Sequence, residues 1–322
     1  MQKPIRIEIP TLFAMGTVNA YLFTEPEPVL VDCGEKTEAS WQALLDGLQK
    51  EGLAVEDIKK IVLTHTHVDH LGQALKIVQR SGAKIWVSQY AYSEVISLNQ
   101  NWDQRLSIMR ETLEMAGVPK DVLQKRIQGM GSLANFWDEI PPDYIHTFQD
   151  DEPIAMGGSE WEVIYTPGHS IKQTCFYQSE LKSLISADML LYITPTPVIE
   201  ANPENPQLRN KGLPQMLESY AKLRALDIED CFPGHGVPFV QHQALIDRQV
   251  KRIHQRKEEL FSHVQSGEEI LYKIAQVMYK DTAPPLRPLG LIMSIGYLDL
   301  LLDEERVACE LQDHIQHLHV KK

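Results

Sequence analysis

The stretch Thr64-His65-Thr66-His67-Val68-Asp69-His70-Leu71-Gly72 places three histidines and one aspartate close together in the chain. It follows the apolar run Ile61-Val62-Leu63, which has the character of a short buried strand, so we expect the polar side chains on the loop leaving its carboxyl end. Imidazole and carboxylate are ligands for zinc, and they also suit iron or manganese. One such loop can begin two neighbouring metal sites. The alternative is a polar surface loop.

Three further junctions between a strand and a loop carry the same residue types. They are Tyr165-Thr166-Pro167-Gly168-His169-Ser170, Ile185-Ser186-Ala187-Asp188 and Cys231-Phe232-Pro233-Gly234-His235-Gly236. In two of them a Pro-Gly pair precedes the histidine, which lets the backbone turn sharply. A complete metal site needs ligands from more than one loop, and these junctions can supply them. The surface-loop alternative therefore loses most of its weight.

Together these motifs resemble the ordered ligand pattern of the metallo-β-lactamase-fold hydrolase superfamily, over about residues 5–240. The resemblance implies a four-layer αββα sandwich of the α/β class and a two-metal centre. It assigns seven metal ligands: His65, His67 and His169 for the first metal, Asp69, His70 and His235 for the second, and Asp188 as the bridge between them. Because all seven positions are filled, we expect two divalent ions, zinc first, with iron or manganese as alternatives.

The composition favours a soluble globular protein, with 43% hydrophobic and 23% charged residues. The net charge of −13 argues weakly against a sequence-independent nucleic-acid binder, although a local basic groove would escape that average. The 4 cysteines form no C-x-x-C pair, which favours reduced thiols over a zinc ribbon or a disulfide scaffold. The first residues lack the apolar core of a signal peptide, and the most apolar segment, residues 289–302, is short for a bilayer. We therefore expect a cytoplasmic protein with no membrane partner.

The N-terminal third alternates strands and helices, as in a layered α/β domain. The spacing of apolar residues predicts strands at 5–9, 18–23, 28–32 and 83–88, with helices at 37–50 and 71–80. The third strand ends in Asp32-Cys33-Gly34. Asp32 is a candidate for orienting a ligand histidine by accepting its second N–H. An equal alternative is that Asp32 caps the next helix.

Residues 90–145 interrupt this alternation as an insertion of two or three helices, at 91–98, 103–116 and 120–127. The insertion carries several large apolar residues: Trp102, Met109, Met115, Met130, Phe136 and Trp137. Apolar residues at helical spacing are usually core. An insertion at the mouth of a metal cleft must nevertheless cover something, so we expect a lid that forms part of an apolar pocket. The substrate is then expected to have an apolar moiety.

The remaining chain divides into returning strands and a C-terminal region. Strands at 161–165, 173–177, 182–186 and 228–232 and a helix at 213–225 complete a metallo-β-lactamase-fold domain of residues 1–240. Residues 241–322 predict a C-terminal helical domain, with a charged final helix, that has winged-helix character, packs on the core or mediates homodimerisation. We expect His314, His317 and His319 on a solvated face of that last helix.

The converging histidines and carboxylates predict metal-assisted hydrolysis. Without cations their lone pairs and charges would lack partners. Two divalent ions would lower the pKa of water to ~7 and give a metal-bridging hydroxide as the nucleophile. Asp69 is a ligand that could also take up and pass on the released proton. Tyr192, shortly after Asp188, could donate to the substrate oxyanion, but we favour core packing for its side chain.

The acidic charge and the apolar insertion favour a binuclear metallohydrolase that cleaves a carboxylic ester, thioester or lactone of a small-molecule substrate. Three alternatives remain open: a phosphodiesterase or ribonuclease of the same fold, an iron-dependent sulfur or oxygen redox enzyme, and a non-catalytic regulatory binding protein. The motifs are also similar to those of glyoxalase II-like hydrolases of glutathione thioesters. The recognition residues of those enzymes cannot be matched in the C-terminal region, so that substrate is not assigned.

Overall fold

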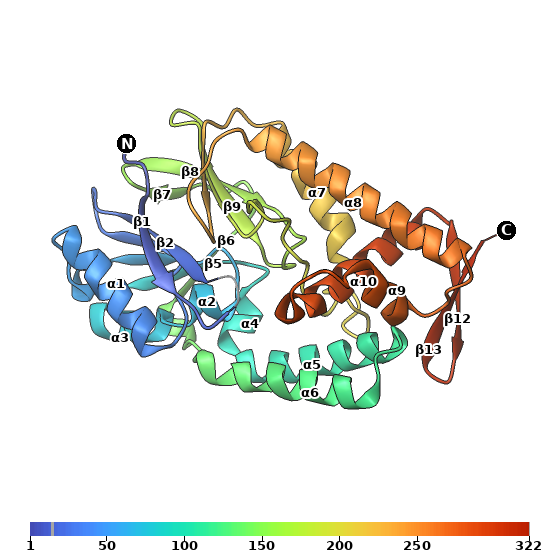
Figure 1. The fold of residues 1–322 in the computed structure, drawn as a ribbon. Helices are drawn as coiled ribbons and strands as arrows, with labels where there is room; N and C mark the ends of the chain where they lie inside the picture. Colours follow the sequence, from blue (N-terminus) through green and yellow to red (C-terminus); the bar gives the residue numbers. More distant parts are fainter. Residues whose placement is uncertain (14–15, 322) are drawn as a thin grey trace.

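Two β-sheets pack face to face, and helices cover both outer faces (Figure 1). The computed structural model describes residues 1–13 and 16–321. The first sheet has the order β1-β2-β3-β4-β5-β6, with strands β1 (Ile5–Pro10), β2 (Thr17–Phe23), β3 (Val29–Val31), β4 (Lys60–Val62), β5 (Lys84–Ser88) and β6 (Ile145–Phe148). From β3 to β6 neighbouring strands run parallel. Their carboxyl ends therefore share one edge of the sheet.

The second sheet has the order β11-β10-β9-β8-β7. Its strands are β7 (Ile154–Met156), β8 (Ser159–Tyr165), β9 (Thr174–Gln178), β10 (Ser183–Ala187) and β11 (Asp230–Pro233). Strands β10 and β11 run parallel, whereas β7 to β10 form antiparallel pairs. The parallel pair brings the ends of β10 and β11, with the loops that follow them, to the same edge.

Alternation along each strand separates the layers. In β2, Ala20 and Leu22 point to the core beneath α1 and α3, whereas Tyr21 and Phe23 point between the sheets. The core between the sheets combines residues of both, including Trp161 of the second sheet, which is fully buried. A strand with two buried faces is expected where a sheet lies between two layers. The four-layer αββα sandwich implied by the sequence motifs is confirmed.

Helices α1 and α3 on the outer face of the first sheet are amphipathic. On the first sheet lie α1 (Glu38–Lys50), α2 (Val68–Leu71) and α3 (Ala74–Ser81), with η1 (Val55–Asp57) between strands. Helix α1 begins at Thr37, whose side chain accepts a hydrogen bond from the Ser40 backbone N–H. It buries Trp41, Leu44 and Leu48, which share one face. The second sheet is covered by α7 (Gly212–Arg224) and the C-terminal helices.

The predicted helical insertion joins β5 to β6. It consists of α4 (Tyr92–Ile96), α5 (Leu98–Met115), α6 (Lys120–Gly131), η2 (Ser132–Phe136) and η3 (Pro142–Tyr144). Trp102 packs in the core of the first sheet, while Leu113 packs with the C-terminal helices. At the far end, the backbone N–H of Tyr272 donates to the carbonyl of Ala116 at 2.9 Å. The insertion is therefore held at both ends of the molecule rather than hanging free.

The C-terminal region contains α8 (His242–Gln265), α9 (Leu271–Met278), η4 (Pro284–Leu286) and α10 (Arg287–Asp303). One continuous apolar core joins these helices to α7 and to strands β9 and β10. The span Pro284–Asp303 is long and apolar enough to cross a membrane by length and composition, but 61% of its apolar window is buried within the protein. The Arg209 guanidinium donates a hydrogen bond of 2.7 Å to the carboxylate of Asp299 in this helix. This helix is apolar because it is a core helix.

The predicted final helix is wrong. Residues 307–320 form a hairpin of β12 (Val307–Gln312) and β13 (Ile315–Val320). Its two-residue turn, Asp313 and His314, has φ of 48° and 67°, the conformation that favours hairpins. His317 and His319 therefore lie on a strand, and His317 Nδ1 is 3.0 Å from the Glu269 carboxylate. The sequence misled because the turn residues are not the usual Asn-Gly or Asp-Gly.

Candidate metal centre

Four strand ends bring the seven predicted ligand residues together. His65 and His67 follow β4, Asp69 and His70 begin α2, His169 follows β8, and Asp188 and His235 follow β10 and β11. They form two groups in which the ligand atoms lie within 4.8 Å of one another: His65, His67, His169 and Asp188 in one, and Asp69, His70 and His235 in the other. No further such group occurs in residues 1–13 and 16–321.

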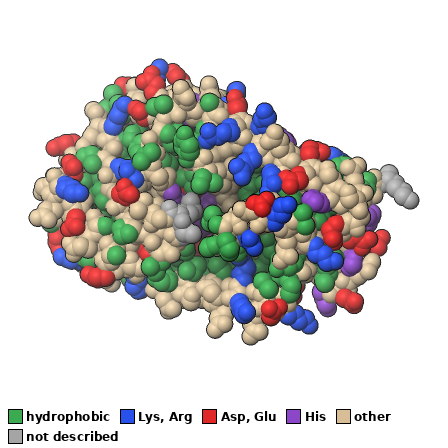
Figure 2. All heavy atoms as spheres, in the orientation of Figure 1, with side chains coloured by type: hydrophobic (Ala, Val, Ile, Leu, Met, Phe, Trp, Pro, Cys, Tyr) green, Lys and Arg blue, Asp and Glu red, His purple; other side chains and the backbone are tan. Residues whose placement is uncertain are grey.

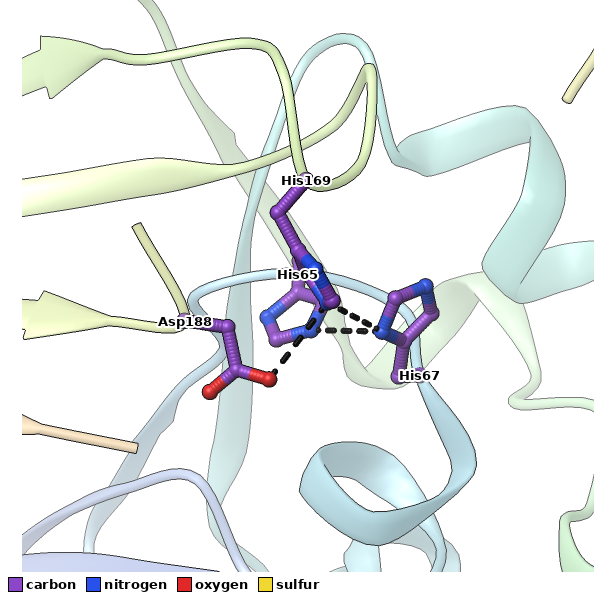
Figure 3. Close-up of side chains that lie close together, drawn as sticks. All are labelled: His65, His67, His169 and Asp188. Atoms are coloured by element: carbon purple, nitrogen blue, oxygen red, sulfur yellow. Dashed lines mark hydrogen bonds and ion pairs between the residues drawn. The ribbon is translucent and has the colours of Figure 1, made fainter. Parts of the chain in front are cut away.

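The first group encloses a small volume between its ring nitrogens (Figure 3). His67 Nδ1 lies 2.9 Å from His65 Nε2 and 3.0 Å from His169 Nε2. His169 Nε2 is in turn 3.4 Å from Asp188 Oδ2. Ring nitrogens that face one another so closely need a proton or a cation between their lone pairs. Three imidazoles and one carboxylate suit a borderline divalent metal such as zinc.

Asp188 connects the two groups. Its Oδ2 is 3.4 Å from His169 Nε2 of the first group and 3.3 Å from His235 Nε2 of the second, and its Oδ1 is 3.5 Å from His70 Nε2 of the second. His235 Nε2 also lies 3.3 Å from Asp69 Oδ2. The carboxylate thus faces histidines of both groups, as a bridging ligand would.

Hydrogen bonds hold three of the histidines by the nitrogen that faces away from the centre, whereas the outward Nε2 of His67 has no partner among the described residues. His70 Nδ1 lies 2.8 Å from Asp32 Oδ2, His169 Nδ1 donates to the Thr196 carbonyl at 2.9 Å, and His235 Nδ1 donates to the Thr17 carbonyl at 2.7 Å. Such contacts fix the tautomer and the ring orientation, leaving Nε2 to bind a metal.

Asp32 organises the start of the His-rich loop. Besides His70, its carboxylate accepts from the backbone N–H of Thr64 at 2.9 Å and from the Thr64 hydroxyl at 2.8 Å. Because that hydroxyl donates to Asp32, its oxygen can accept from His65 Nδ1, 2.9 Å away. The side chain that caps the following helix, α1, is Thr37. Asp32 itself has a φ of 58°, a strained conformation typical of functional sites.

The charges of the two groups differ. Burial, and then the positive charge of neighbouring histidines, hold the pKa of His65 and of His67 well below the usual range, which favours the neutral, ligating form. Burial would also lower the pKa of His235, but Asp188 and Asp69 overcome it and raise that pKa to about 10. Asp188 and Asp69 therefore attract positive charge strongly to the second group.

Unpartnered polar atoms at the centre fit a divalent cation. Asp188 Oδ1 and His70 Nε2 are buried and have no hydrogen-bond partner among the residues that the structure describes. Leaving such groups unpaired in the interior costs about 1–3 kcal/mol each. Bound metal would satisfy both. The donor set, imidazole nitrogen with carboxylate oxygen, is the one that divalent transition metals prefer.

Gly234 allows the backbone of the β11 loop to approach this centre. A Cβ atom at this position would lie 2.1 Å from Asp188 Oδ1 and 3.0 Å from His70 Cε1. Any side chain at 234 would therefore displace the bridging carboxylate. The backbone N–H of Gly234 also donates to the Ala187 carbonyl at 2.8 Å, which holds the two loops together.

A buried ion network beside the centre was not predicted from the sequence. Lys172 pairs with Glu94 of α4 and lies 3.5 Å from Glu200. Glu94 accepts from the Thr66 hydroxyl at 2.9 Å, and Glu200 accepts from the Ile171 backbone N–H at 2.7 Å. The network connects the loop that carries His65 and His67 and the loop that carries His169 to α4 of the insertion. Its members come from distant segments and form no local motif, so only the fold reveals them.

The expectation from the sequence that Tyr192 packs in the core is wrong. Its side chain is 71% exposed, and the Arg248 guanidinium lies 5.2 Å from the centre of its ring. The segment after Asp188 turns outward here, because Leu190 and Leu191 already fill the interior.

Comparison with known proteins gives the family. Residues 15–235 match the profile of the Metallo-beta-lactamase superfamily. A relative from Bacillus subtilis (strain 168), "Probable metallo-hydrolase YqjP", is 28% identical to this chain. The match covers 94% of this chain and 93% of the relative. The "Atrochrysone carboxyl ACP thioesterase" of Aspergillus fumigatus is 21% identical over 78% of this chain and 60% of its own length.

A solved structure extends the likeness to nearly the whole fold. The metallo-beta-lactamase family protein TTHA1429 from Thermus thermophilus superposes with a TM-score of 0.79 and 22% sequence identity, covering 98% of each chain. The likeness therefore includes the insertion and the C-terminal region as well as the residues of the family profile. The chain is a metallohydrolase and belongs to the metallo-β-lactamase superfamily.

Proposed function

We propose that the protein hydrolyses a carboxylic ester, thioester or lactone of a small molecule with an apolar moiety, using two divalent ions, of which zinc is the first choice. The observation that carries the proposal is the placement of Asp188 between two groups of histidines, with His169 on one side and His70 and His235 on the other. One carboxylate shared by two ligand groups is suited to a pair of ions rather than to one.

The residues of such a centre would have different roles. His65, His67 and His169 would hold one ion, Asp69, His70 and His235 the other, and Asp188 both. Such ions supply an activated water and polarise the carbonyl of the substrate. Burial raises the pKa of Asp69, but His70 and His235 lower it below its usual range. Asp69 therefore stays ionised and can accept a proton at its carboxylate.

The surroundings of the centre support an apolar moiety. Figure 2 shows hydrophobic side chains around the central hollow in which histidine is visible. Exposed apolar residues occur on segments near the ligand loops, namely Leu12, Tyr192, Ile193 and Leu208. The insertion adds half-buried residues such as Leu106, Met130 and Phe136. Exposed apolar surface beside a polar centre is typical of a site for a partly apolar ligand.

A thioester is the member of this class that we favour, because one relative is named for hydrolysis of a carrier-bound thioester. We also propose a cytoplasmic location, because all four cysteines are free and three of them are buried. A small-molecule substrate, no nucleic-acid partner and a homodimer remain part of the proposal.

A substrate panel tests the proposal against its alternatives. Protein loaded with zinc is assayed with nitrophenyl esters, acyl thioesters, lactones and bis-nitrophenyl phosphate. We expect turnover of at least one of the first three classes, increasing with the length of the acyl group. Turnover of the phosphodiester alone would replace the proposal with a phosphodiesterase. One bound iron with oxygen uptake would replace it with a redox enzyme, and no turnover at all would favour a regulatory binding protein.

A further inference from the structure

Helix α8 carries a row of basic residues along its outer face. Arg248, Lys251, Arg252, Gln255 and Arg256 line a shallow, open depression of about 460 Å³ on this helix, called the groove below. Their spacing of three and four residues places them on one side of the helix. From Arg248 to Arg256 the helix rises by ~12 Å. The groove is therefore a cationic strip about two turns long, in a protein whose net charge is −13.

Most of these cations have no carboxylate partner. Within residues 1–13 and 16–321, no ion pair is formed by Arg248, Lys251 or Arg252, whereas Arg256 pairs with Glu259 at 2.5 Å. Other exposed arginines do have carboxylate partners, for example Arg80 with Glu56 and Arg224 with Asp247. Neighbouring like charges that are left unpaired repel one another, so an anion in the groove would relieve that repulsion.

One end of the groove contacts the segment that follows Asp188. The Arg248 guanidinium donates to the Tyr192 carbonyl at 3.4 Å, and Gln249 Nε2 donates to the Leu191 carbonyl at 2.6 Å. Leu191 and Tyr192 follow Asp188 within four residues of the chain. Lys and Arg side chains lie along the side of the central hollow (Figure 2). One extended molecule could therefore occupy both the groove and the centre.

We propose that this groove binds the phosphate groups of a coenzyme A thioester while the thioester carbonyl lies at the metal centre. The inference rests on the proposed function and names the carrier portion of its substrate. Guanidinium groups match phosphate oxygens with two parallel hydrogen bonds, and several phosphates on one carrier match several cations. The apolar acyl group would lie toward the insertion. A strip of two turns in an otherwise acidic protein is short for nucleic acid, which requires many phosphate contacts.

A series of three substrates, called the ladder, tests the groove kinetically. All three have the same acyl group and differ in the number of phosphates. The ladder contains the acyl-coenzyme A, the acyl-phosphopantetheine with one phosphate, and the acyl-pantetheine with none. We expect KM to rise at each step, while kcat changes little. Arg252→Gln should raise KM for the acyl-coenzyme A about tenfold, the loss expected for one charge-assisted hydrogen bond. It should leave the acyl-pantetheine unaffected, and Arg252→Lys should recover part of the loss.

Arg80→Gln is the matched control. It also removes one arginine, but Arg80 lies on α3 rather than α8 and is paired with Glu56. It should leave KM unchanged for every member of the ladder. Equal KM values for the acyl-coenzyme A and the acyl-pantetheine in the wild type would overturn the inference. So would an equal rise in KM for Arg252→Gln and Arg80→Gln.

A binding measurement separates this inference from the proposed function. Titration calorimetry with coenzyme A itself, which has no bond to hydrolyse, should show binding to the wild type and to Arg80→Gln. Binding should weaken at least tenfold in the double variant Lys251→Gln, Arg252→Gln, and should weaken with added salt. If coenzyme A binds in this way but no thioester is cleaved, the groove is correct and the reaction is not. If single-stranded RNA binds through the same residues and coenzyme A does not, the groove proposal fails.

Discussion

The metal loops and the α8 groove place polar groups in opposite ways. In the loops, the outward nitrogens of His70, His169 and His235 each have a hydrogen-bond partner, and the inward nitrogens converge on a small volume. In the groove, exposed cations such as Lys251 and Arg252 have no ion-pair partner in the described parts of the chain. The loops are organised before any ligand arrives. The groove is left for a ligand to complete. The difference suggests that chemistry and substrate choice can be changed separately.

Asp188→Ala should have the largest effect, because it removes the carboxylate that faces His169 of the first group and His70 and His235 of the second. We expect loss of both metal ions and of all measurable hydrolysis, checked by elemental analysis and by the substrate panel. His317→Ala, on the distant β13, should change neither quantity. Equal effects of the two substitutions would mean that the centre has been assigned wrongly.

Gly234→Ala tests how closely the loops must approach. The added methyl group would lie 2.1 Å from Asp188 Oδ1, so the carboxylate must move. A displacement of about 1 Å can cost about 100-fold in rate, and we expect a loss of kcat of that order with an unchanged circular dichroism spectrum. Gly129→Ala in α6 is the control, because its Cβ would meet nothing within 4 Å and its φ is not positive. If Gly129→Ala loses as much activity as Gly234→Ala, close approach is not the reason.

Asp32→Asn tests the orientation of His70 from outside the ligand set. The amide can still accept a hydrogen bond, but it no longer carries the charge that favours the ligating tautomer. We expect metal affinity to fall about 10–100-fold, as for other changes to groups behind ligand histidines. Competition with a chelator measures the affinity. Unchanged affinity would show that the contact of 2.8 Å between Asp32 and His70 does not support metal binding.

Proton release should show the smallest effect and report on the charges of the second group. Burial lowers the pKa of His235, but Asp188 and Asp69 raise it to about 10, so the metal-free protein holds this proton at pH 7. Because a ligand histidine must be neutral, zinc binding should release it. Zinc affinity should therefore rise with pH up to about that pKa. Calorimetry in buffers of different ionisation enthalpy measures the release, and zinc binding without it would contradict the assigned charges.

The ligand loops could be predicted from local patterns, and the resemblance of those motifs to the superfamily implied the sandwich. Alternating apolar residues define strands such as β1, and the His-rich motif and the Pro-Gly pairs stand at the ends of strands. The sequence did not predict groups that only tertiary structure brings together. Lys172 meets Glu94 and Glu200 across 78 and 28 residues of chain, respectively.

The same limit explains the errors near the surface. The hairpin of β12 and β13 has a turn of Asp313 and His314, and the apolar residues of β13 do not alternate regularly with polar ones, so a charged helix was predicted instead. The exposure of Tyr192 and the groove on α8 depend on how neighbouring segments pack. Composition alone indicated an acidic protein, and the local basic strip was visible only once α8 had a defined outer face.

Titration of metal-free protein with zinc, followed by hydrolysis of a substrate found in the panel, tests the paired centre most directly. The two ligand groups predict that bound zinc and activity both reach a plateau at two equivalents per chain. A plateau of both at one equivalent, with the second group of residues dispensable on substitution, would contradict the account.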